Sequence, residues 1–129
     1  MRERRPEHPR RLGIAAGVLA GLGVVAGAFG AHALRGRLEP ASLVTFETAA
    51  RYQLIHALAA AFAADRAGRS ESPAAARASG VFLAGVLLFS GSLYVLAMGG
   101  PRLAGAITPV GGLAFMAGWG LLAASFARD

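Results

Sequence analysis

The chain has 129 residues, of which 55% are hydrophobic and only 16% are charged. Soluble domains typically carry roughly 25% charged residues, so this composition favours a membrane protein. The absence of cysteine excludes disulfides, thiolate metal sites and cysteine nucleophiles. The net charge of +6 comes from arginines at the ends of apolar runs, with no basic stripe interleaved with aromatics. We therefore predict the lipid bilayer, and no nucleic acid, as a partner.

Four apolar segments follow one another, separated by short polar breaks. Residues 12–34, 79–100 and 103–127 are uncharged and long enough to span a membrane, since 23 helical residues cover roughly 34 Å of a core about 30 Å thick. Residues 43–64 form a doubtful fourth span, because polar residues interrupt it. We predict an all-α polytopic membrane protein, a compact bundle of four transmembrane helices over residues 12–129, preceded by a basic tail at 1–11.

The arginines predict the orientation of this bundle. Nine lie in the tail, the second loop and the C-terminus, and three lie in the first and third loops. The positive-inside rule then places both termini in the cytoplasm. The alternative is a cleaved secretory signal ending at Ala31-His32-Ala33. Its apolar run is longer than usual, and the segments that follow are themselves membrane-like.

Glycines predict how the first span packs. They recur at helical spacing, at Gly13, Gly17, Gly21, Gly23, Gly27 and Gly30. Small residues let helix backbones approach closely in lipid. We expect this span to pack against the other three helices, and a homodimer seam is the alternative.

The last span contains Pro109, followed by Gly111 and Gly112. Proline removes a backbone donor, so we predict a kink or a short unwound turn there, with the two glycines in helix packing. Trp119 is expected either to anchor the helix at the interface or to pack inside the bundle.

Five segments in order resemble a known family. They are GAFGAHAL at 27–34, TAARYQLIHAL at 48–58, LFSGSLY at 88–94, ITPVGG at 107–112, and Gly118-Trp119. With these, the chain resembles the YgdD-like and YwdK-like family of small uncharacterised bacterial membrane proteins, grouped under a domain of unknown function. The resemblance implies a compact four-helix protein of the inner membrane. It implies no activity.

Alternation of the helices predicts a polar pocket. The end of the first span, the start of the second, the end of the third and the start of the fourth all lie on the same side of the membrane. With cytoplasmic termini this is the outer half of the bilayer. The predicted pocket comprises His32, Glu47, Thr48, Arg51, Tyr52, His56, Ser90, Ser92, Tyr94 and Thr108.

The second span was expected to turn its polar half towards this pocket. At 100° per residue, the polar residues from Glu47 to His56 lie on one half of the helix circumference, and Gln53 alone lies outside that half. The opposite arc is apolar and was expected to face lipid; it carries Phe46, Ala50, Leu54, Ala57 and Ala61.

The roles of the charged residues stay open at this stage. Glu47 and Arg51 are four residues apart and can pair, which favours a structural role over an ion or ligand site or snorkelling to the headgroups. His56 is expected to make one hydrogen bond, with proton transfer as the alternative. His32 and His56 should differ in depth by well over about 10 Å, so haem is not expected. We predict no cofactor and no metal site.

Three functional classes were compared. The first is a non-enzymatic scaffold, assembly or envelope factor. The alternative is binding or transport of an ion, a proton or a small lipophilic ligand through the polar pocket. Four spans without an inverted repeat do not favour a self-sufficient transporter, although a homo-oligomer or a membrane-protein partner could complete one. An enzyme is not predicted, because Ser90 and Ser92 lack a base and neither HExxH nor a phosphate loop occurs.

Overall fold

The computed structural model describes residues 6–128, and every regular element in that range is helical. The elements in chain order are α1 (Glu7–His32), α2 (Pro40–Ser70), α3 (Pro73–Gly85), η1 (Val86–Ser90), α4 (Gly91–Ala97) and α5 (Ala104–Arg128). α3, the π-helical turn η1 and α4 follow without a break and form one rod, which we call the α3–α4 rod. The predicted all-α, four-helix architecture is therefore confirmed.

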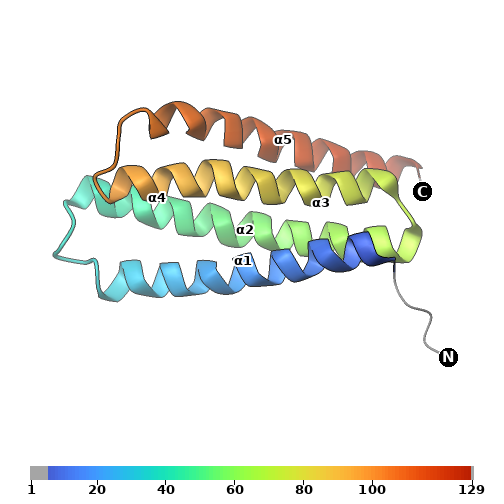
Figure 1. Ribbon diagram of the computed structural model, residues 1–129, viewed down its shortest axis with the longest axis horizontal. Coiled ribbons are helices and arrows are strands. Elements are labelled where there is room, and N and C mark those ends of the chain that lie inside the picture. The colour runs from blue at the N-terminus through green and yellow to red at the C-terminus, as the bar shows by residue number, and fades with distance from the viewer. Residues whose placement is uncertain (1–5, 129) are drawn as a thin grey trace.

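The helices lie side by side in the order α1, α2, the α3–α4 rod and α5 (Figure 1). α1 packs mainly on α2, and α5 mainly on the α3–α4 rod, so α1 and α5 occupy opposite edges of the molecule. The start of α1 and the end of α5 lie at one end, and the loops after α1 and α4 lie at the other. α2 and the rod therefore have neighbours on both sides.

Three of the helices have the length and apolar composition of membrane spans: α1, the α3–α4 rod and α5. α2 has 31 residues, about 46 Å of helix, but carries charges within it. α2 lies between α1 and the rod along their length (Figure 1).

The helix ends follow local chemistry as well as hydropathy. α1 begins at Glu7, so the predicted tail is helical in its second half, where Arg11 pairs with Glu7. The helix thus begins before the apolar run, which starts at Leu12. The tail residues Arg2, Arg4 and Arg5 lie outside the described residues. α2 and α3 each begin with a proline in the first turn. Backbone N–H groups there have no acceptor within the helix, so the N–H that proline lacks costs no hydrogen bond.

Small residues form the contacts between helices. α2 buries a series of alanines, among them Ala49, Ala60 and Ala63, which let α1 and the α3–α4 rod approach it closely. The larger members of this core are Phe82 and Phe115, which lie between the rod and α5.

The glycines of α1 are used differently from the prediction. A Cβ atom at Gly23 would lie 3.0 Å from the Leu54 side chain, and one at Gly30 would lie 2.9 Å from the Phe46 ring. These two glycines admit α2 side chains. Gly17, Gly21 and Gly27 have no heavy atom within 4 Å of a Cβ, so the predicted intramolecular packing is wrong for them. They project away from α2 because they lie on other faces of the same helix.

α5 continues through Pro109 from Ala104 to Arg128, so of the two predicted alternatives, a kink or a short unwound turn, the unwound turn does not form. Gly111 lets α5 lie close to the rod, because a Cβ there would overlap the backbone nitrogen of Phe89. Gly112 makes only an ordinary contact, 3.9 Å from the Phe89 ring. The packing role predicted for this pair therefore belongs chiefly to Gly111.

Candidate functional site

The orientation of α2 decides which polar residues face the bundle, and it differs from the prediction. Phe46, Ala50 and Ala57, expected to face lipid, are buried. Arg51 and Tyr52, expected to face the bundle, are exposed, and Glu47 is half-buried. The hydrophobic effect does not separate apolar residues between lipid and protein, so close packing decides, and it selects the small side chains for the helix contacts.

His56 is buried where α2 meets the α3–α4 rod and α5, as predicted. Its Nδ1 lies 2.8 Å from the Tyr52 carbonyl oxygen, and the indole Nε1 of Trp119 donates to its Nε2 over 3.2 Å. The imidazole stacks on the Phe115 ring, with 3.5 Å between the ring centroids. His56 therefore joins α2 to α5 through Nε2 and one ring face, and its Nδ1 bonds within α2, where the sequence predicted a single hydrogen bond.

Gln53 is the interior polar residue that the sequence reasoning missed. Its Nε2 donates to the Leu19 carbonyl oxygen over 2.8 Å, and its Oε1 accepts from the Tyr94 hydroxyl over 2.7 Å. One amide thus joins α1, α2 and α4. Gln53 lies on the same side of α2 as Phe46 and Ala57, which the sequence analysis expected to face lipid. Placing that side inside the bundle would have predicted a buried Gln53.

The serine and threonine hydroxyl groups of the predicted pocket bind backbone or each other. Ser90 donates to the Ala49 carbonyl oxygen over 2.7 Å, which joins η1 to α2. Ser92 donates to the Phe89 carbonyl oxygen and shares a 2.6 Å hydrogen bond with Thr108 on α5. These contacts occur at and just after the π-helical turn, a feature that is frequent at functional sites.

The predicted single pocket does not form. His32 is exposed at the end of α1, and Thr48 bonds the Val44 carbonyl oxygen on its own helix. The interior groups separate into the His56 contacts, the Gln53–Tyr94 contacts and the Ser92–Thr108 pair. In residues 6–128 every buried side-chain nitrogen or oxygen has a hydrogen-bond partner. Because α1 and α5 lie at opposite edges, their polar groups cannot meet.

The exposed face of α2 carries a regular series of residues that we call the α2 stripe. It consists of Val44, Thr48, Arg51, Ile55, Leu58 and Phe62, spaced alternately by four and three residues. Its large apolar members are 46% to 70% exposed. This is the spacing of a heptad seam, with Arg51 in the middle of it. Glu47 lies beside the stripe, one turn before Arg51.

Arg51 lies near the middle of the apolar length of the bundle. The neighbouring Tyr52 packs on Phe89, with 4.8 Å between ring centroids. Phe89 follows Arg77 by 12 residues, about 18 Å of helix, and precedes the end of α4 at Ala97 by eight residues, about 12 Å of helix. The half-thickness of the hydrocarbon core is about 15 Å. Arg51 is thus an exposed cation near mid-depth.

Neither charge on this face has a partner within the described part of the chain. The ion pairs there join Arg11 to Glu7 and Arg69 to Asp65, and Glu47 and Arg51 take part in neither. The pairing predicted between Glu47 and Arg51 is therefore not present. Thr48 and Ile55, their neighbours on the stripe, offer no charge.

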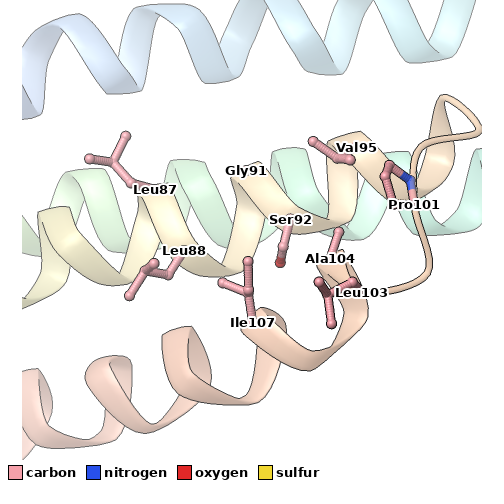
Figure 2. A pocket seen from close by; sticks show the side chains of 9 residues that line it. All are labelled: Leu87, Leu88, Gly91, Ser92, Val95, Pro101, Leu103, Ala104 and Ile107. Atoms are coloured by element: carbon pink, nitrogen blue, oxygen red, sulfur yellow. The ribbon is translucent and has the colours of Figure 1, made fainter.

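A groove opens between α4 and the start of α5 (Figure 2). It holds about 380 Å³, and Ser92 is its one polar side chain. The other lining residues are Leu87, Leu88, Gly91, Val95, Pro101, Leu103, Ala104 and Ile107. Because Ser92 bonds Phe89 and Thr108, the groove presents an apolar wall to whatever occupies it.

A second link that the sequence did not reveal joins α2 to α5 at the end that carries the termini. Arg66 donates to the Ser125 hydroxyl over 2.9 Å and to the Ser125 carbonyl oxygen over 3.0 Å. Its guanidinium lies 3.8 Å from the centroid of the Phe126 ring. This arginine, counted only as a topological signal, also fixes the C-terminal turn of α5.

Comparison with known proteins gives consistent matches. Residues 26–112 match the family described as "Protein of unknown function (DUF423)". The UPF0382 inner membrane protein YgdD of Escherichia coli K12 is 44% identical over 77% of this chain and 76% of its own length. The UPF0382 membrane protein YwdK of Bacillus subtilis is 42% identical over 76% and 80%. A UPF0382 membrane protein of Staphylococcus haemolyticus is 43% identical over 78% and 82%. No solved structure matches the chain.

Proposed function

Because the chain belongs to the DUF423 family of membrane proteins, whose function is unknown, we propose a function from its geometry. It is a non-enzymatic assembly protein of the inner membrane, and it acts by binding another transmembrane segment through the α2 stripe. The observation that carries this proposal is the exposed Arg51 near the middle of the membrane.

The energetic argument rests on the charge. A lone charge at the centre of a transmembrane helix costs about 2.5 to 3.5 kcal/mol on insertion scales. The level of Arg51 is about 12 Å of helix from the nearer end of the rod, too far for its side chain alone to bring the guanidinium fully to the headgroups. Lipid supplies no hydrogen-bond acceptor there. A partner segment with a carboxylate against Arg51 would remove most of this cost.

The interior supports a structural role over a catalytic one. Its polar groups, foremost Gln53 and His56, are used in hydrogen bonds that join one helix to the next. Such hydrogen bonds stabilise helix association in lipid. A bundle that exposes a charged residue on the α2 stripe fits a protein that presents a binding surface.

The orientation with both termini in the cytoplasm is part of the proposal. It is supported by nine arginines against three, and by the position of the start of α1 and the end of α5 at one end of the molecule (Figure 1). Cysteine-labelling reagents that do not cross membranes test it, because the natural chain has no cysteine. Ala41→Cys, exposed at the start of α2, should be labelled from outside intact cells and Ser70→Cys should not. The reverse pattern would overturn the orientation.

Photo-crosslinking in native membranes tests the binding function. A photo-reactive amino acid at Leu58, 70% exposed on the α2 stripe, should form an adduct with a membrane protein. The matched control is Leu113, 65% exposed on α5, which should react only with lipid. Lipid adducts alone at both positions would refute the assembly function.

A second candidate function, binding of a lipophilic molecule, is favoured by the groove between α4 and α5 (Figure 2). A Cβ at Gly91 would enter open space, so Gly91→Leu should fill the groove without forcing the helices apart. Gly80→Leu on α3 is the control, because Gly80 is equally open but does not line the groove. Native mass spectrometry of gently purified protein should show an added mass that only Gly91→Leu removes. A bare chain in all three samples would exclude this candidate.

A further inference from the structure

We propose that the segment bound by the α2 stripe is the α2 stripe of a second copy of this chain, so that the protein is a parallel dimer. This inference rests on the proposed binding function and names its partner. The two-fold axis would run along the membrane normal between the two α2 helices.

The geometry of the stripe fits its own copy. Copies inserted with the same orientation present their stripes side by side and parallel, so each residue faces its counterpart at the same depth. Alternate spacing by four and three residues keeps such a seam in contact along two supercoiled helices. Ile55, Leu58 and Phe62 supply large side chains to this seam.

The charges are self-complementary. Each copy brings Glu47 and Arg51 to the same face of α2, one turn apart and without a partner in its own chain. Two copies therefore assemble two carboxylates and two guanidiniums at one depth, with no net charge. Glu47 of one copy can then pair with Arg51 of the second. An unrelated partner would have to carry its own carboxylate at that depth.

The other exposed faces do not compete for this role. Val18, Val24 and Val25 on α1, and Leu113 and Met116 on α5, are more than half exposed and apolar. Lipid solvates such residues as well as a protein neighbour does. The stripe of α2 differs because it holds charge at mid-depth, which lipid cannot satisfy.

Cysteine scanning in membranes tests the seam. Because the natural chain lacks cysteine, a single introduced cysteine can form a disulfide only with another copy. A disulfide requires Cβ atoms about 3.5 to 4.5 Å apart. With a lipid-permeable oxidant, Ile55→Cys and Leu58→Cys should give covalent dimers, and Val24→Cys and Leu113→Cys should stay monomeric. Equal crosslinking at all four sites would indicate random collision and overturn the dimer.

Charge reversal tests the pairing separately. Glu47→Arg places four cations at the seam, and Arg51→Glu places four anions. Each variant should lose the Leu58→Cys dimer by roughly tenfold or more, since like charges in contact oppose association. Co-expression of the two variants should restore crosslinking between unlike chains, as should the double variant Glu47→Arg/Arg51→Glu. Unchanged dimer yield in the single variants would refute the charge pairing.

The outcomes separate this inference from the proposed function. An adduct between photo-reactive residue 58 and a different protein, with no disulfide between copies, would refute the dimer and leave the assembly function standing. Lipid adducts alone together with no disulfide would refute both.

Discussion

The indole N–H of Trp119 on α5 points at the imidazole of His56 on α2, with 3.2 Å between Nε1 and Nε2. On the other side of the ring, Nδ1 lies 2.8 Å from the Tyr52 carbonyl oxygen. An indole can only donate and a carbonyl can only accept. The two contacts together therefore fix a neutral imidazole with its proton on Nδ1.

The tautomer is directly measurable. Nitrogen-15 NMR of the protein in bilayers should show a protonated Nδ1 and an unprotonated Nε2 on His56. In Trp119→Phe the proton should stay on Nδ1, because the Tyr52 carbonyl still accepts it. A proton on Nε2 in the natural chain would contradict the arrangement.

The same contact should contribute measurably to stability. Trp119→Phe removes the donor and keeps a ring against Phe82, and His56→Phe keeps a ring against Phe115. The coupling between the two substitutions in a double-mutant cycle should be about 0.6 kcal/mol and at most about 1.7 kcal/mol. Reversible unfolding in mixed detergent micelles gives these free energies. Additive effects of the two substitutions would show that no hydrogen bond forms.

Adjacent glycines on α5 should respond in opposite ways. A Cβ at Gly111 would overlap the Phe89 backbone, which cannot move aside as a side chain can, so Gly111→Ala should destabilise by about 1 to 3 kcal/mol. Gly112→Ala meets only a 3.9 Å contact and should change stability by less than about 0.5 kcal/mol. Equal losses at both positions would mean that α5 is rotated relative to the rod.

The glycines of α1 provide a parallel comparison. Gly23→Leu should disrupt packing on α2, because even its Cβ would lie 3.0 Å from Leu54. Gly17→Leu and Gly21→Leu enter open space and should leave both the unfolding free energy and the Leu58→Cys dimer unchanged. Loss of that dimer in Gly17→Leu would move the contact between copies to the glycines of α1.

Much of the fold could be predicted from the sequence, because hydropathy and length define helices in a membrane directly. The four helices and the shared end of the chain termini follow from apolar runs such as residues 12–34 and the breaks between them. The start of α1 at Glu7 could not be predicted from the apolar runs, since a helix can extend beyond the apolar segment into water.

The rotation of α2 could not be predicted from polarity. A polar residue in lipid is costly, which argued for turning Arg51 inward, but the alanines on the opposite arc permit the closest helix contacts. Gln53 and His56 satisfy the interior hydrogen bonds. Arg51 is left outside, where only a neighbour beyond the chain can reach it. The separation of the predicted pocket follows from this rotation.

The central claim, that the α2 stripe is covered in the membrane, can be measured without knowing the partner. A nitroxide spin label at residue 58 and one at residue 113 replace leucines of similar exposure, 70% and 65%. Oxygen dissolved in the bilayer should relax the label at 113 freely and the label at 58 much less, because a neighbouring helix shields it. Equal oxygen accessibility at the two positions would show that α2 faces lipid and would contradict the account.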